Sequence, residues 1–150
     1  MTQPITHPLV VVAKKYMSVF NGMVGDLQLD RYQYTLVLIQ QHEERLSQKA
    51  LSDILRIDKS YMVTIIDYLS DKGYVKREKN PNDRREQLIK LTDKAREDLN
   101  HIKNVFDELN KKSLQNIKEE DIDTFNRVLK TIETNLNPGD RKNIKAEFKP

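Results

Sequence analysis

Apolar residues recur at steps of three and four along most of this chain, which is the spacing of one face of an α-helix. These stretches predict helices at about 8–24, 30–44, 47–55 and 58–72, followed by two long helices within 93–136. Four of the stretches follow a residue with the short acceptor side chain of a helix N-cap: Asp30, Ser47, Asp58 and Thr92. The chain is therefore predicted to be mainly helical.

The first three predicted helices are expected to contribute to the core. Apolar side chains cover a broad arc of helix 8–24, which favours burial on more than one side, and Gly22 and Gly25 mark its end. The middle of helix 30–44 is almost entirely apolar, as is typical of a core helix. The short helix is expected to be buried through Ala50, Leu51, Ile54 and Leu55.

The helix predicted at 58–72 has two unlike faces. Its core face is formed by Met62, Ile65, Ile66 and Leu69. Its polar face is formed by Thr64, Asp67, Tyr68 and Asp71. Gly73 follows at the position where a helix commonly ends, because glycine adopts the left-handed conformation without a Cβ penalty.

A β-hairpin is predicted directly after this glycine. Residues 74–77 and 87–91 are short and β-prone, and residues 80–85 between them favour turns and leave Arg84 and Arg85 exposed at the tip. Leu46 is expected to begin a minimal strand at the edge of the hairpin. Helix, glycine stop, strand, basic turn and strand, in this order, predict a winged helix-turn-helix.

The last two helices each carry a narrow apolar seam at alternating steps of three and four. These two helices cannot bury their apolar seams against each other alone. A helical dimer interface that includes the first helix would cover them. The predicted fold is mainly α with a small β-wing (α+β), a winged helix-turn-helix on a helical dimerisation scaffold. We expect one domain over 1–150, with the winged helix-turn-helix at 46–91, dimerisation helices at 8–25 and 93–136, and a flexible tail at 140–150.

Composition excludes several classes of protein. The chain has no cysteine, which removes disulfides, thiolate metal sites and cysteine-based switches. A phosphate-binding glycine loop, a histidine-rich metal motif and a Gly-x-Ser-x-Gly elbow are all absent from the sequence, so we expect neither an enzyme nor a bound cofactor. No run approaches the ~20 apolar residues that cross a bilayer, and no secretory signal is evident. A cytoplasmic protein without membrane contact is expected.

The net charge of +3 is concentrated in one region. Residues 46–91 hold ten basic and seven acidic side chains, whereas the segments before and after are each balanced. A basic patch in neutral surroundings is expected of a localised contact with nucleic-acid phosphates. In one interpretation helix 58–72 lies in the DNA major groove and the hairpin reaches an adjacent minor groove. In the other, a solvated hairpin lies beside an amphipathic helix.

This region resembles the MarR family of bacterial transcriptional regulators. The resemblance rests on residues 46–51 and 69–75, on the wing motif Asn80-Pro81-Asn82-Asp83-Arg84-Arg85, and on the junction Leu91-Thr92. It implies that the first helix joins two subunits and lines a ligand cavity. It also implies that Arg85 enters the minor groove and that Asp83 holds it in place. The sequence differs from many members by having Thr64 and Tyr68 where they carry arginine, which favours A·T-rich sites or weaker binding.

Ten residues are the candidate DNA contacts. Ser47, Lys49, Ser60 and Lys79 are expected to contact phosphates. Base contacts are expected from Ser60, Tyr61 and Thr64, next to Lys59 at the start of the same helix. The wing contributes Asp83, Arg84 and Arg85, with Arg84 competing for the role of Arg85. In the alternative interpretations Tyr61 folds onto its helix, and Asp83 with Arg85 only rigidifies the turn.

Candidate ligand sites are less distinct. The resemblance implies a small aromatic or phenolic effector. The residues expected to line its cavity are Tyr16, Met17, Phe20, Tyr32, Tyr34 and Leu36, although aromatic residues at helical spacing are more often plain core. His42, Glu43 and Glu44 beside His101 are candidate metal ligands, but no two histidines have the i, i+4 spacing of a helical site.

The sequence thus predicts a ligand-responsive transcriptional regulator, a repressor that binds double-stranded DNA at a pseudo-palindromic operator as a homodimer. One alternative is a winged-helix module whose basic wing contacts an acidic protein. A second alternative is a metal-sensing regulator of the same fold.

Overall fold

Six helices and a two-stranded antiparallel sheet make up the part of the chain that this computed structural model describes, residues 3–25, 27, 29 and 31–136. In chain order they are α1 (Thr6–Val24), α2 (Gln33–Gln41), α3 (Gln48–Leu55), α4 (Lys59–Asp71), β1 (Val75–Asn80), β2 (Asp83–Leu91), α5 (Asp93–Ser113) and α6 (Glu119–Asn135). The predicted α+β fold class, mainly helical with a small β-wing, is confirmed. The predicted tail at 140–150 lies outside the described residues.

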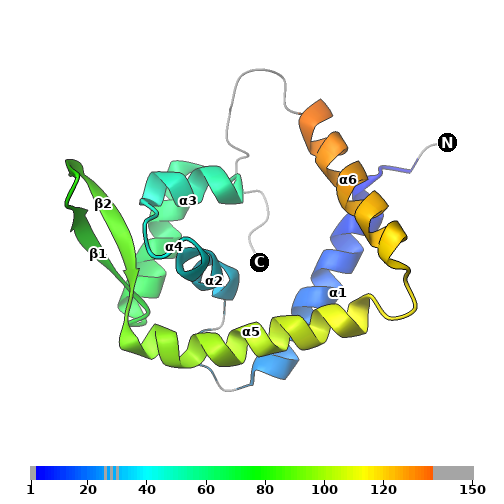
Figure 1. Ribbon diagram of the computed structural model, residues 1–150, viewed down its shortest axis with the longest axis horizontal. Coiled ribbons are helices and arrows are strands. Elements are labelled where there is room, and N and C mark those ends of the chain that lie inside the picture. Colours follow the sequence, from blue (N-terminus) through cyan, green and yellow to red (C-terminus); the bar gives the residue numbers. More distant parts are fainter. Residues whose placement is uncertain (1–2, 26, 28, 30, 137–150) are drawn as a thin grey trace.

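Helix α5 joins two groups of elements (Figure 1). At its beginning lie α2, α3, α4 and the hairpin, which we call the winged-helix lobe. At its end lie α1 and α6, which we call the α1–α6 lobe. Contacts of α5 with α1, α2 and β2 make this long helix the link between both lobes. None of the described helices is long and apolar enough to cross a membrane.

Three predicted N-caps fix where helices of the winged-helix lobe and α5 begin. The side chains of Ser47, Asp58 and Thr92 each accept a hydrogen bond from the backbone N–H three residues further on, at 3.2, 2.8 and 3.2 Å. The hydroxyl of Thr92 also donates to the carbonyl oxygen of Gly73 at 2.6 Å. The start of α5 is thereby tied to the end of α4.

The predicted glycine stop after α4 is confirmed. Gly73 has a φ of 79°. The Tyr74 N–H donates to the Leu69 carbonyl at 2.8 Å, and the Gly73 N–H donates to the Ser70 carbonyl at 2.9 Å. This pair of bonds is a Schellman motif, which satisfies the last carbonyls of the helix and turns the chain into β1. Tyr74 is fully buried immediately after the turn.

The bounds predicted for the second helix are wrong. Helix α2 begins at Gln33, after Tyr32 with a φ of 66°, and ends at Gln41. The proposed cap, Asp30, lies outside the described residues. At the other end, Glu43 and Glu44 have φ values of 54° and 58°, so the helix cannot continue to Glu44. The carboxylate of Glu44 instead accepts the backbone N–H of Leu91 at 3.0 Å, which brings this turn against β2.

The hairpin pairs Val75 with Leu91 and keeps an antiparallel register up to Lys79 opposite Gln87. The predicted minimal strand is present, because the Leu46 carbonyl accepts the Ile89 N–H at 2.9 Å. The buried side chains of β2 lie near its end and cover the core of the winged-helix lobe.

The hairpin tip differs from the prediction. The turn is formed by Pro81 and Asn82 alone, and Arg84 and Arg85 belong to β2. Asn80 pairs with Asp83 and Lys79 with Gln87, so residues 84–86 are extra on β2 and form a bulge. Both arginines therefore lie beside the tip, on a bulged and exposed stretch of strand.

Burial is less extensive than predicted in two helices. Of the residues in α1, only Phe20 and Val24 are buried, and Val12 is 65% exposed. The expectation that this helix is buried on more than one side is wrong for the single chain, because α5 covers only one of its faces. In α3, Ile54 is 41% exposed, and Ser52 is buried beside Leu51 instead.

Candidate nucleic-acid interface

A groove of about 520 Å³ runs between the beginning of α3 and the wing. Its lining residues come from both elements: Ser47, Gln48, Lys49, Arg77, Lys79, Asp83, Arg84, Arg85, Glu86, Gln87 and Ile89. Six of the ten predicted DNA contacts therefore share one concave surface: Ser47, Lys49, Lys79, Asp83, Arg84 and Arg85. The cap at Ser47 and the wing register bring them together.

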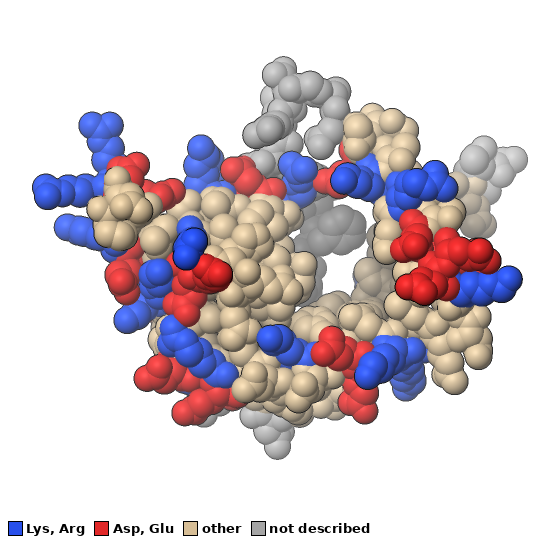
Figure 2. Space-filling view, in the orientation of Figure 1, with Lys and Arg blue, Asp and Glu red and all other residues tan. Residues whose placement is uncertain are grey.

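The groove has an excess of uncompensated positive charge. Five basic and two acidic side chains line it. Among the described residues, four of these basic side chains take part in no ion pair: Lys49, Lys79, Arg84 and Arg85. Lys and Arg side chains project from the wing into solvent, at the left of Figure 2. An anionic polymer would be attracted to this surface.

The fifth basic residue of the groove, Arg77, connects three elements. Its guanidinium donates to the Asp67 carboxylate on α4 at 2.6 Å and to the Gln48 side chain on α3 at 3.2 Å. Because Arg77 lies in β1, these contacts fix the wing relative to the two helices of the helix-turn-helix. They also neutralise Asp67 on the exposed face of α4.

The wing tip is held by short-range hydrogen bonds. The Asn80 side chain accepts the Asn82 N–H at 2.9 Å and donates to the Glu86 carboxylate at 2.7 Å. The Asp83 carboxylate accepts the backbone N–H of Arg85 at 2.9 Å. No ion pair between Asp83 and the Arg85 guanidinium is present in this part of the structure. Asp83 therefore orders the backbone of the bulge and leaves the Arg85 side chain available.

The exposed face of α4 carries three predicted contacts. Lys59, Ser60 and Thr64 are all exposed. The Ser60 hydroxyl donates to the Asp58 carboxylate at 2.5 Å, and the Thr64 hydroxyl donates to the Ser60 carbonyl at 3.4 Å. Val63, which the sequence interpretation did not single out, is 40% exposed beside Thr64.

Tyr61 turns away from this face toward the loop before α2. Its hydroxyl lies 3.2 Å from the hydroxyl of Tyr32, and the two rings meet edge to face at 6.5 Å. The hydrogen bond to Tyr32 and partial burial raise the pKa of Tyr61 to about 12. The side chain is thus held against the winged-helix lobe in this structure.

Tyr68 does not lie on the polar face of α4 as predicted. It is half-buried, and its ring meets that of Tyr32 edge to face at 5.4 Å. The Arg31 guanidinium lies 5.5 Å from the ring centre and the Lys72 ammonium 5.8 Å, both within range of a cation–π interaction. Its hydroxyl is buried and has no hydrogen-bond partner among the described residues. The ring packs into the lobe because Tyr32 and Arg31 cover it.

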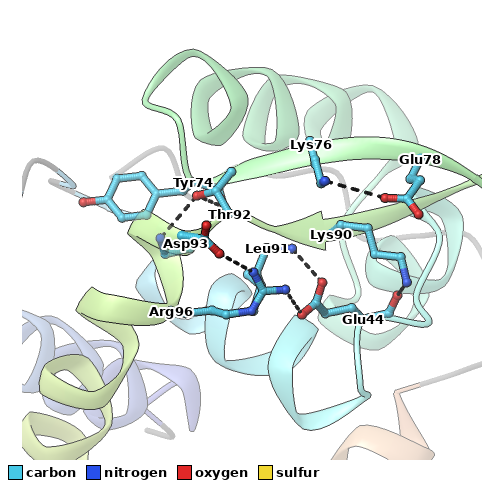
Figure 3. Close-up of polar contacts among 10 residues, drawn as sticks. Glu44, Tyr74, Lys76, Glu78, Lys90, Leu91, Thr92, Asp93 and Arg96 are labelled. Atoms are coloured by element: carbon cyan, nitrogen blue, oxygen red, sulfur yellow. Dashed lines mark hydrogen bonds and ion pairs between the residues drawn. The ribbon is translucent and has the colours of Figure 1, made fainter.

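A polar cluster anchors the root of the wing to α5 (Figure 3). The Glu44 carboxylate accepts from the Arg96 guanidinium at 2.5 Å and from the Leu91 N–H at 3.0 Å. The Lys90 ammonium donates to the Glu44 carbonyl at 2.8 Å. The loop after α2, the end of β2 and the first turns of α5 are therefore connected through one side chain.

The candidate ligand residues lie in four different environments. Tyr16 and Tyr34 line a groove of about 350 Å³ between α1, α2 and α5, together with Val37, Gln41, Lys103, Phe106, Asp107 and Asn110. Phe20 lies next to this groove, stacked on Phe106 at 4.2 Å, and Leu36 is fully buried. Tyr32 contacts α4 instead, and Met17 is exposed. The structure thus brings only part of the predicted set together.

The candidate metal ligands do not converge. A ring nitrogen of His42 lies 3.0 Å from the Leu38 carbonyl, and one of His101 lies 3.0 Å from the Val24 carbonyl. Glu43 pairs with Arg45, whereas Glu44 belongs to the cluster at the wing root. No cluster of three or more possible metal ligands occurs among the described residues.

Sequence reasoning missed several residues of the groove and of the α4 face. Arg77 and Gln48 were not predicted. A basic residue in a strand that follows a helix with an acidic face does give some indication of an ion pair between the two elements. Glu86 and Gln87 enter the groove only because of the bulge, which no local pattern indicates. Val63 could have been found as the apolar residue that breaks the polar face of α4.

The comparisons with known proteins agree with this geometry. The model of the MarR family matches residues 32–87, the stretch from the residue before α2 into β2. The uncharacterized HTH-type transcriptional regulator YdgJ of Bacillus subtilis is 29% identical over 102 residues, which cover 68% of this chain and 62% of that protein.

Solved structures agree over more of the chain. A protein from Listeria monocytogenes, classed as a MarR family transcriptional regulator and crystallised with a 26mer DNA, is 25% identical with a TM-score of 0.79, and the match covers 90% of each chain. The MepR–DNA complex of S. aureus is 15% identical with a TM-score of 0.81, covering 89% of this chain and 97% of that one, a likeness of fold alone.

The family match contains α3, α4 and most of the wing, and one solved MarR family protein shares the fold over 90% of the chain. Residues 32–87 of this protein are thus similar to the MarR family of transcriptional regulators, and its fold is that of a solved MarR family protein.

Proposed function

We propose that this chain regulates transcription by binding double-stranded DNA, and that the groove between α3 and the wing contacts the phosphate backbone. The observation that carries the proposal is the set of four basic side chains in this groove without an ion pair to any described residue: Lys49, Lys79, Arg84 and Arg85. Phosphate contacts of this kind give affinity that is independent of base sequence and sensitive to salt.

The wing and α4 have complementary roles in this proposal. Helix α4 enters the major groove with its exposed face, and the bulged stretch of β2 reaches the adjacent minor groove. Arg85 suits a narrow minor groove, because its guanidinium is permanently charged and weakly hydrated. The hydrogen bond from the Arg85 backbone to Asp83 supports this role, since it orders the chain without occupying the guanidinium.

We further propose that the protein acts as a homodimer on a pseudo-palindromic operator. Helix α6 has no buried residue in the single chain, and apolar side chains of α1 are also exposed. A second copy that covers these surfaces would place two α4 helices about 34 Å apart, one turn of DNA. The Listeria and S. aureus relatives were both solved with DNA.

Response to a ligand is the third part of the proposal. The groove that contains Tyr16 and Tyr34 is formed by α1, α2 and α5, so an aromatic or phenolic compound bound there would contact elements of both lobes. It would act by favouring one spacing of the two α4 helices over another, and its effect would be bounded by its difference in affinity for the two spacings. We expect the protein to be a repressor that such a compound releases.

The test is a titration of the purified chain with a duplex from the region upstream of its own gene, over a range of salt concentrations. The logarithm of the association constant should fall linearly with the logarithm of salt, by about 0.9 for each phosphate contacted. Arg85→Ala should weaken binding by roughly tenfold, equivalent to about 1.4 kcal/mol. Arg127→Ala, which removes an exposed arginine from α6, is the matched control and should bind as the unaltered protein does. A slope near zero, or equal affinity of the two variants, would contradict the proposal.

A further inference from the structure

The middle of the exposed α4 face is apolar. Val63 is 40% exposed there, whereas its neighbours Met62 and Ile65 are buried in the core of the lobe. Thr64 is exposed beside it. An exposed valine is ordinary on a protein surface by itself, but this one lies at the centre of the helix that the proposed function places in the major groove.

The hydroxyl of Thr64 is directed back to its own helix. It donates to the Ser60 carbonyl one turn earlier, at 3.4 Å. The hydroxyl hydrogen of Thr64 is thereby engaged, which leaves its methyl group and the acceptor lone pairs of its oxygen for an external partner. Together with the two methyl groups of Val63, the Thr64 methyl group forms a small apolar surface on the outside of α4.

The polar groups around this surface are already engaged. The Asp67 carboxylate pairs with Arg77 at 2.6 Å, and the Ser60 hydroxyl donates to Asp58 at 2.5 Å. Lys59, in the first turn, is the one basic residue in the sequence of α4. The middle of α4 thus lacks an arginine, the side chain that recognises guanine through two hydrogen bonds. It offers methyl groups to the bases instead.

In the major groove, the base edges carry one apolar group, the 5-methyl of thymine. We infer that Val63 and Thr64 select thymine at the centre of each half-site by packing their methyl groups against this 5-methyl group. The inference rests on the proposed function and adds a specificity to it. A T·A pair is favoured because its methyl is buried against α4. Cytosine is disfavoured because it has no methyl group to bury against this surface.

The test begins with selection of bound duplexes from a random library by the full-length protein. The selected site should contain a thymine that the central face of α4 contacts in each half. Each thymine is then replaced by uracil, which removes the 5-methyl group and keeps every hydrogen-bonding group. Replacement of the contacted thymine should weaken binding about threefold to fivefold per half-site, the effect of exposing one buried methyl group. Replacement of thymines elsewhere in the site should leave affinity unchanged.

Protein variants assign the effect to the two side chains. Val63→Ala and Thr64→Ser each remove methyl groups, retain the helix and, in the second case, retain the hydroxyl. In the double variant the loss on uracil replacement should fall below about twofold, which corresponds to the ~0.3–0.5 kcal/mol within which independent effects add. Arg85→Ala is the matched control. It should lower affinity for both duplexes equally, because the thymine methyl lies in the other groove.

The outcomes separate the inference from the proposed function. If no duplex is enriched and none binds at low salt, the proposed function fails and the inference fails with it. Selective, salt-dependent binding without a uracil-sensitive thymine would overturn the inference alone. A uracil effect of the same size in the double variant would also overturn it, because another residue would then contact the methyl group.

Discussion

The two lobes of this molecule differ in how far one chain completes its own core. In the winged-helix lobe, Met62, Ile66 and Leu69 of α4 are fully buried, and β2 and α5 close the core around them. In the α1–α6 lobe, α6 has no buried residue, and Phe125 on its apolar seam is 53% exposed. The two lobes nevertheless use the same helical spacing of apolar residues.

This difference shows what an apolar seam does and does not specify. Its spacing predicts a helix and identifies the face that is to be buried. The surface that covers this face is decided elsewhere, by α2, α5 and the wing in one lobe. In the other lobe the proposed second copy covers it. The proposed function assigns recognition of DNA to the lobe that is complete in one chain, and pairing of the subunits to the lobe that is not.

The largest expected effect is a cavity in the complete lobe. Leu69→Ala removes a fully buried side chain and should lower the free energy of unfolding by about 3 kcal/mol, within the range for leucine deletions in protein cores. Denaturant unfolding measures the loss. Leu114→Ala, at an exposed leucine after α5, is the control and should change stability by less than ~0.5 kcal/mol. Similar losses in both variants would mean that the core is not where the structure places it.

The next prediction concerns the incomplete lobe. Phe125→Asp places a charge on the seam of α6 and should weaken self-association about a hundredfold, or roughly 2.7 kcal/mol, because the charge must be desolvated in the interface. Sedimentation equilibrium gives the dissociation constant. Thr124→Asp adds the same charge to an exposed position off the seam and should leave association unchanged. Should neither variant associate less tightly than the parent, α6 is not the subunit interface.

A smaller effect is expected where the wing joins α5. Glu44→Ala removes the acceptor of the Leu91 N–H and one of the two acceptors of the Arg96 guanidinium, which keeps Asp93, and should cost about 2 kcal/mol of stability. Glu43→Ala, which breaks only an exposed pair with Arg45, should cost less than ~0.5 kcal/mol. Thermal unfolding compares the two variants, and equal losses would exclude the anchoring role of Glu44.

The smallest effect lies within the complete lobe. Tyr32→Phe removes the hydrogen bond to Tyr61 and should cost about 1 kcal/mol. Folding raises the pKa of Tyr61 from 10.0 to about 12, so the neutral phenol is favoured, and the stabilisation present below pH 10 is lost as pH rises toward 12. Ultraviolet titration of tyrosinate should show this pKa returning toward 10 in Tyr32→Phe. A Tyr61 pKa that stays near 12 in Tyr32→Phe would show that the bond is not formed in solution.

Local sequence determined much of this structure because capping and turn chemistry act over a few residues. The acceptor side chains of Ser47, Asp58 and Thr92 fixed three helix starts, and Gly73 fixed the end of α4. The wing motif gave the resemblance to the MarR family and predicted the basic surface. These features depend on neighbours along the chain, which a pattern of residues records directly.

Tertiary structure alone decided which side chains remain available. Tyr68 is covered by Tyr32 and Arg31, and Asp67 is neutralised by Arg77, whereas Val63 is left exposed. The spacing of residues in α4 distinguishes a core face from an outer face, but it does not show which outer positions another element covers. That depends on contacts between residues far apart in sequence, and these form only when the chain has folded.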